Sequence, residues 1–162
     1  MSRKSLIVRI VVGAILVTLA LPAFGQSTAN PAEKDLRPGS PVLIHPQELA
    51  TLLKSPKGRK PLVFYIGPEI FYQQAHIPGA EFLGPDSMPQ GVEKLHKRAA
   101  ALSRATFIVI YCGCCPWSHC PNIHPAYNEL KKMGFSKVRV LFLETSFGTN
   151  WADRGFPVEK GS

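Results

Sequence analysis

The chain has 162 residues and a formal charge of +8, from 19 Lys and Arg against 11 Asp and Glu. This length suits one folded domain with a sizeable core. The positive charge is modest, and no aromatic residues are interleaved with the basic clusters at residues 54–60 and 94–98. These clusters are therefore interpreted as solvated surface, and no nucleic-acid partner is expected.

The first 25 residues have the three parts of a secretory signal peptide. A basic start is followed by an apolar run at residues 10–21, and Ala-Phe-Gly at residues 23–25 supplies the small residues of a cleavage site. The apolar run is shorter than the roughly 20 residues that span a bilayer, so an uncleaved membrane anchor is the less favoured alternative. We predict cleavage before Gln26 and a periplasmic or secreted protein, with no stable membrane insertion after cleavage.

Residues 26–41 are polar and rich in Pro, Ser and Gly, which predicts a flexible linker, and residues 42–162 are expected to form the folded domain. Apolar residues at helical spacing predict helices at residues 46–54, 69–74, about 92–102, 123–133 and about 148–153. Short apolar runs predict strands at residues 61–66, 80–83, 106–111 and 138–143. This alternation indicates an α/β domain with a mainly parallel central sheet flanked by helices, and the strand at 106–111 is expected near its centre.

All four cysteines lie within nine residues, between the strand at 106–111 and the helix at 123–133: Cys112, Cys114, Cys115 and Cys120. In open α/β sheets, ligands bind at this end of the strands. The N-terminus of the helix also offers unpaired N–H groups that stabilise a thiolate. The pattern therefore predicts sulfur chemistry in this loop.

Several arrangements of these thiols fit the spacing. They could form a disulfide, or one thiol could act as a nucleophile that the other three modulate or resolve. Cysteine thiolates and imidazoles could instead bind a soft metal, Cu(I) or Zn(II). The ligands of such a metal site would come from Cys114, Cys115, Cys120 and His119, with His124 as a further donor. Trp117 lies in the same loop and either covers the thiols or presents a contact surface.

Four short strings, in the expected order, resemble signatures of the rhodanese-like domain family. They are His76-Ile-Pro-Gly-Ala80, Ile110-Tyr-Cys112, Gly134-Phe-x-x-Val138-x-x-Leu141, and Trp151 followed by Gly155-Phe-Pro-Val158. The resemblance covers about residues 42–160. It implies that the whole folded part is a single rhodanese-like domain.

The resemblance also implies sulfur transfer. In the family, one cysteine takes a sulfane sulfur from a donor such as thiosulfate or a persulfide, holds it in a cradle of backbone N–H groups, and passes it to a thiol or another nucleophile. Cys112 matches this cysteine by position, and no cofactor is implied. The chain departs from the family pattern because Tyr65 and Gly67 stand where an Asp-x-Arg is usual, and no Arg lies between Cys112 and the next helix. A catalytically silent rhodanese-like domain used for protein contact is a further alternative.

Overall fold

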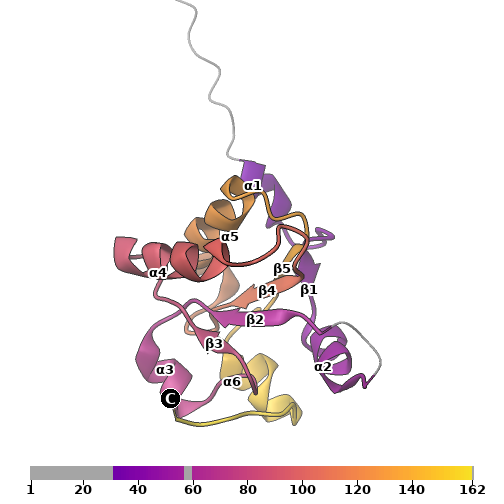
Figure 1. Cartoon of the computed structure of the whole chain (residues 1–162). Coiled ribbons are helices and arrows are strands. Elements are labelled where there is room, and N and C mark those ends of the chain that lie inside the picture. The colour runs from indigo at the N-terminus through magenta and orange to yellow at the C-terminus, as the bar shows by residue number, and fades with distance from the viewer. Residues whose placement is uncertain (1–30, 57–59, 162) are drawn as a thin grey trace, which may run out of the picture.

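The computed structural model describes residues 31–56 and 60–161. Its centre is a sheet of five strands, all paired in parallel, in the order β1-β5-β4-β2-β3 (Figure 1). The strands are β1 (Leu43–Ile44), β2 (Leu62–Tyr65), β3 (Glu81–Phe82), β4 (Ile108–Tyr111) and β5 (Val138–Leu141). The predicted α/β fold is confirmed, and β4 lies at the centre of the sheet as expected.

Helices cover both faces of the sheet, as a parallel sheet requires. They are α1 (Pro31–Asp35), α2 (Pro46–Lys54), α3 (Glu69–Gln74), α4 (Pro89–Ala100), α5 (Ile123–Lys132) and α6 (Phe147–Asn150), with 3-10 turns η1 (Trp117–His119) and η2 (Ala152–Arg154). Buried side chains of α4 and α5 pack on one face, and those of α2 and α6 pack on the other (Figure 1). None of the helices in the described part of the chain has both the length and the apolar composition needed to cross a membrane.

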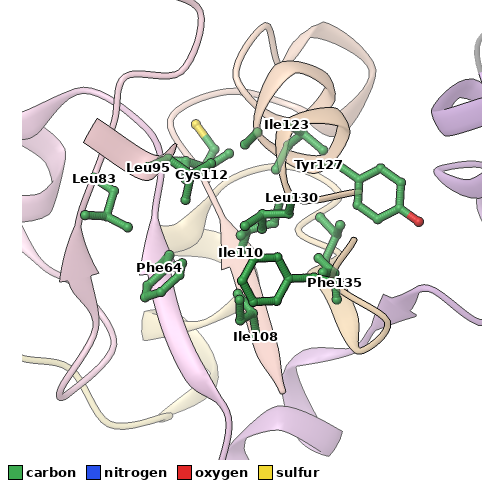
Figure 2. Close-up of a cluster of buried hydrophobic side chains, with 14 of the residues drawn as sticks. Phe64, Leu83, Leu95, Ile108, Ile110, Cys112, Ile123, Tyr127, Leu130 and Phe135 are labelled. Atoms are coloured by element: carbon green, nitrogen blue, oxygen red, sulfur yellow. The ribbon is translucent and has the colours of Figure 1, made fainter. Parts of the chain in front are cut away.

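All four residues of β4 are buried, because helices cover both faces of this strand. Successive side chains point to opposite faces, so Ile110 and Cys112 belong to the core under α4 and α5, whereas Tyr111 belongs to the core under α2 and α6. Figure 2 shows Cys112 close to Leu95 of α4 and Ile123 of α5. The alternation of the strand thus delivers Cys112 to the face on which α5 begins.

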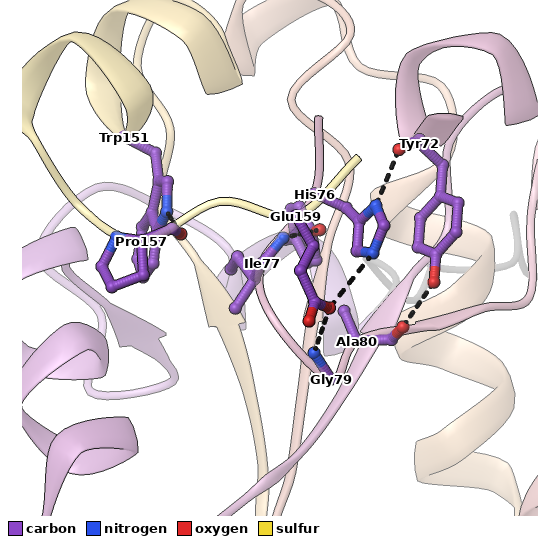
Figure 3. A network of polar contacts seen from close by, with 9 residues as sticks. Tyr72, His76, Ile77, Gly79, Ala80, Trp151, Pro157 and Glu159 are labelled. Atoms are coloured by element: carbon purple, nitrogen blue, oxygen red, sulfur yellow. Dashed lines mark hydrogen bonds and ion pairs between the residues drawn. The ribbon is translucent and has the colours of Figure 1, made fainter. Parts of the chain in front are cut away.

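The Pro-Gly turn that begins at His76 links the end of the chain to the sheet (Figure 3). The His76 ring stacks on Tyr72, and its Nδ1 lies 2.8 Å from the Tyr72 carbonyl oxygen. The backbones of His76 and Glu159 pair as an antiparallel bridge. The N–H of Ile77 donates to the hydroxyl of Tyr111 at the end of β4. The turn is therefore fixed next to the point where the cysteine loop begins.

Part of the segment expected as a flexible linker, residues 26–41, is folded. Helix α1 packs on α5, and Leu36 is only 3% exposed within the core. The Tyr127 hydroxyl of α5 donates to the Asp35 carboxylate at 2.8 Å. The apolar side chain of Leu36 and the hydrogen-bonded carboxylate of Asp35 hold this polar segment against the domain. The folded domain therefore begins earlier than expected. Residues 1–30, with the predicted signal peptide 1–25, lie outside the described residues.

Candidate functional site

Cys112 directly follows the C-terminal end of β4 and is 2% exposed. The next residue, Gly113, has a φ of 78°, in the left-handed region that favours glycine. A Cβ at Gly113 would lie 2.7 Å from the Phe147 Cβ of α6 and 2.9 Å from the Leu143 Cδ1. The glycine therefore lets the chain turn sharply against α6 before it continues towards α5.

Three of the four thiols form a cluster at the N-terminus of α5. The Sγ atoms of Cys112 and Cys114 are 3.2 Å apart, and Cys114 and Cys120 both pack against the buried cluster that contains Cys112. The side-chain amide of Asn122, the residue before α5, donates to the Cys112 Sγ at 3.3 Å. Cys115 lies at the edge of the cluster, with its sulfur 3.4 Å from that of Cys114. We call Cys112, Cys114 and Cys120 the thiol cluster.

The pKa values of the clustered thiols are shifted in opposite directions. The pKa of Cys120 is lowered by the neighbouring thiols of Cys112 and Cys114 and by the backbone N–H groups of Asn122 and Ile123. The pKa of Cys112 is raised by the neighbouring thiols of Cys114 and Cys120 and by its burial. The N-terminus of α5 thus favours the thiolate form of Cys120.

Cys112 borders two separate spaces of very different size. One is a cavity of about 260 Å³, which we call the donor cavity, and its lining includes Tyr65, Phe71, Gln74, Cys114, Ser146 and Phe147. The other is a space of about 10 Å³, lined by Cys115, Trp117, Cys120 and Ile123 among others. The smaller space has room for about one water molecule at most. Of the four cysteines, only Cys112 borders both spaces.

A larger hollow shows that volume alone does not mark the site. It measures about 480 Å³ and lies where the start of α2 meets the segment after β5. His45, Phe142 and Arg154 are among its lining residues, but it holds no thiol. The chemistry-bearing residues border the smaller donor cavity instead.

Tyr65 lines the donor cavity, and Gly67 lies close to both Tyr65 and Cys112. A Cβ on Gly67 would lie 2.6 Å from the Tyr65 hydroxyl oxygen and 2.8 Å from the Cys112 Sγ. Only a residue without a side chain lets the hydroxyl and the thiol come this close together. Burial, followed by the nearby Cys112, raises the pKa of Tyr65, so its hydroxyl stays neutral, and it donates to the Pro68 carbonyl oxygen at 3.2 Å. The departure from the family pattern at residue 67 thus has a packing reason.

The two histidines and the tryptophan expected near the thiols have different surroundings. His119 and His124 are exposed, and the His119 Nδ1 lies 2.9 Å from the Ser118 hydroxyl. Trp117 packs edge-on against Phe142 with ring centroids 5.0 Å apart, and it borders the small space behind Cys112. In the part of the chain that the structure describes, no group of three or more His, Cys, Asp or Glu side chains is arranged to hold a metal ion.

Part of the backbone of the cysteine loop is already hydrogen-bonded within the fold. The N–H of Trp117 donates to the Glu144 carbonyl oxygen, and the N–H of Cys120 donates to the Trp117 carbonyl oxygen. The prolines at positions 116 and 121 have no N–H to offer. The Asn122 amide and the Cys114 thiol contact the Cys112 sulfur. Asn122 and Tyr65 are therefore site residues that the sequence did not single out for this role.

The family of the chain follows from its sequence together with this fold. The family model of the rhodanese-like domain matches residues 45–147, which is more than half of the chain. The chain belongs to the rhodanese-like domain family. A search of curated proteins finds no match to this rhodanese-like domain.

Solved structures of similar fold come from several bacteria. A protein from Anabaena sp. is 22% identical, covers 73% of this chain and 92% of its own, and has a TM-score of 0.54. A protein from Bacillus halodurans is 20% identical, covers 72% of this chain and 75% of its own, and has a TM-score of 0.55. A rhodanese-like domain protein from Staphylococcus aureus is 14% identical, covers 74% of this chain and 98% of its own, and has a TM-score of 0.51. At these identities the likeness concerns the fold alone.

Proposed function

We propose that this rhodanese-like domain accepts a sulfane sulfur on Cys112 and passes it to a thiol acceptor. The observation that carries the proposal is the position of Cys112. It follows the central strand, borders the donor cavity and belongs to the thiol cluster. Membership of the family supports chemistry of the sulfurtransferase type.

In the first step, the Cys112 Sγ attacks the outer sulfur of a persulfide, RS–SH, and the proton of its thiol passes to the leaving group. A bond forms between Cys112 and that sulfur, the S–S bond of the donor breaks, and RS⁻ leaves with the electron pair. The Asn122 amide is held in place because its oxygen accepts the Ser87 N–H at 2.8 Å, so its nitrogen can steady the Cys112 sulfur.

The lining of the donor cavity favours a persulfide over thiosulfate. It contains no Lys or Arg that could bind the sulfonate oxygens of thiosulfate. The rings of Tyr65, Phe71 and Phe147 suit the organic part of a persulfide instead.

The test measures cleavage of the donor. Reduced protein is mixed with one equivalent of cysteine persulfide, and the release of cysteine is followed against a blank without protein. We expect release by the parent and by Cys115→Ser, and a loss of at least about 100-fold in Cys112→Ser. Cys115 is a matched control because its sulfur is not among the partners of Cys112. With thiosulfate, sulfite release should be at least about tenfold slower than cysteine release. Equal rates in Cys112→Ser and the parent would overturn the proposal.

A further inference from the structure

We infer that the sulfur does not remain on Cys112: Cys120 attacks Cys112, forms a Cys112–Cys120 disulfide, and releases the sulfur as hydrogen sulfide. The domain would thus act as a sulfane-sulfur reductase that uses the electrons of its own two thiols. The inference rests on the proposed function, since Cys112 must first carry the sulfur. It adds a second chemical step and a different product.

Cys112 borders two separate spaces, and the groups of this step are divided between them. Displacement at sulfur needs the attacking group and the leaving group in line with the sulfur between them. A sulfur delivered through the donor cavity arrives in the space that Cys114 also lines. Cys120 borders the small space together with Cys112 and does not line the donor cavity. Cys120 is therefore better separated from the arriving sulfur than Cys114 and is the more suitable attacking group.

Cys120 is also held close to Cys112. Both residues border the small space, and Cys120 packs against the buried cluster that contains Cys112. A fixed neighbour reacts faster than an acceptor that must diffuse in. The small space leaves no room for an outside thiol. The thiol that reaches Cys112 through this space is therefore part of the protein.

The step balances without a further reactant. It starts from the persulfide Cys112–S–SH and the thiol of Cys120. The Cys120 sulfur bonds to the Cys112 Sγ, the bond between Cys112 and the outer sulfur breaks, and HS⁻ leaves with the electron pair. The proton from Cys120 completes H₂S. The outer sulfur gains two electrons, and the two cysteine sulfurs lose one each. A dithiol reductant from outside would reopen the disulfide for the next turnover.

A single-turnover experiment follows the fate of the sulfur. Protein reduced with a dithiol and freed of it is mixed with one equivalent of cysteine persulfide, and both sulfide and intact mass are measured. We expect the parent to release about one equivalent of sulfide and to become lighter by about 2 Da, the mark of a disulfide. Cys120→Ser should release little sulfide and retain one added sulfur of about 32 Da. Cys114→Ser and Cys115→Ser should still release sulfide.

The parent alone supplies a second measurement, in case Cys120→Ser fails to fold. Cleavage after Tyr111, Trp117 and Tyr127 separates Cys112 from Cys120, because Trp117 lies between them in the sequence. After the reaction, we expect the peptide that begins at Cys112 to be joined by a disulfide to the peptide that contains Cys120. A disulfide confined to the first peptide would assign the step to Cys114 or Cys115 and overturn the inference.

The outcomes also separate this inference from the proposed function. If the parent cleaves the donor but keeps the added sulfur and releases no sulfide, the proposed function stands and the inference is overturned. If Cys114→Ser retains the sulfur and Cys120→Ser does not, the attacking thiol has been assigned wrongly. If neither the parent nor any variant releases cysteine from the donor, the proposed function fails, and the inference fails with it.

Discussion

Gly67 keeps open a space that the site needs, which gives a prediction at the scale of single residues. A methyl group in Gly67→Ala would lie within 3 Å of both the Tyr65 hydroxyl and the Cys112 sulfur. We expect a loss of about 1–3 kcal/mol in the free energy of unfolding, the usual cost of overpacking. Donor cleavage should also slow, because the Cys112 sulfur is displaced. Urea unfolding and cysteine release from cysteine persulfide measure the two effects.

A matched glycine and a double variant test the cause. Gly148 borders the donor cavity, but a Cβ there would meet only the Ser146 Oγ, at 3.6 Å. Gly148→Ala should therefore stay within about 0.5 kcal/mol of the parent. Combining Gly67→Ala with Tyr65→Phe removes the shortest of the three close contacts and should recover part of the lost stability. If Gly67→Ala has the stability of the parent and cleaves the donor at the same rate, the close approach of residue 67 to the Tyr65 hydroxyl and the Cys112 sulfur is unimportant.

Asp86 gives a prediction about how the free energy of unfolding depends on pH. Its side chain is 1% exposed, and neither carboxyl oxygen has a hydrogen-bond partner. Burial, and then the charge of Glu129, raise the pKa of Asp86 to about 7. Between about pH 4 and pH 7 the unfolded chain ionises this carboxyl while the folded protein keeps it protonated. The free energy of unfolding should therefore fall as the pH rises through this window, by an amount on the order of 3 kcal/mol from Asp86.

Comparing variants isolates the contribution of Asp86 from that of other groups. Asp86→Asn cannot ionise, so its stability should fall less than that of the parent between about pH 4 and pH 7. Urea unfolding at several pH values in this range measures the difference. Asp153→Asn changes an exposed carboxyl and should follow the parent. Identical pH profiles for the parent and Asp86→Asn would contradict the prediction.

Only part of this site could be read from the sequence. The four cysteines were visible as a group, because they are the whole cysteine content and follow an apolar strand. The roles of Asn122 and Tyr65 depend on distances across the fold: Ser87 fixes the Asn122 amide, and the missing side chain of Gly67 admits the Tyr65 hydroxyl. Which of the four thiols has a lowered pKa depends on which sulfur lies near the N–H groups at the start of α5. The spacing of the cysteines in the sequence cannot show this.

At the scale of elements, the sequence was most informative where strands are buried on both faces. β2 and β4 appeared as continuous apolar runs, since neither side of a central parallel strand meets water. β5 was recognised from the apolar residues around Arg139. β1 has only two residues and was not predicted, because two residues show no period. The helix expected at about residues 148–153 is divided into α6 and η2 by Trp151, whose φ of −123° is not helical. α1 was missed because its sequence is polar and its anchor, Leu36, lies beyond its end.

The anchoring of α1 yields a prediction about stability. Leu36→Ala removes a side chain that is 3% exposed and should lower the free energy of unfolding by about 2–4 kcal/mol. Tyr127→Phe loses the hydrogen bond to Asp35 and should cost about 1 kcal/mol. Glu33→Ala, in the same helix but exposed, is the control and should change little. Denaturant unfolding measures all three. If Leu36→Ala matches Glu33→Ala, the segment contributes nothing to the folded unit.

At the scale of the whole molecule, the end of the chain folds back to support the start of the site. The Trp151 Nε1 donates to the Pro157 carbonyl oxygen at 2.8 Å, and Glu159 pairs with the turn at His76 (Figure 3). Ile77, the next residue of that turn, donates its N–H to the hydroxyl of Tyr111, the residue before Cys112. The thiol cluster thus depends on contacts between segments far apart in the chain.

The last prediction concerns where this molecule works. The basic start, the apolar run at residues 10–21 and the small residues at 23 and 25 predict export with cleavage before Gln26. N-terminal sequencing of the mature protein should therefore begin at or close to Gln26. Full-length chain in the membrane fraction would favour an uncleaved anchor instead.

Export would also determine whether the thiols are oxidised or reduced. Outside the cytosol, thiols this close together tend to be oxidised, since no glutathione pool keeps them reduced. The protein isolated from that compartment without reductant should be lighter by about 2 Da for each disulfide, and a dithiol should restore the full mass. The same protein produced in a reducing cytosol provides the comparison. If both preparations carry four free thiols, the thiol cluster does not meet an oxidising compartment, and the predicted export loses its chemical support.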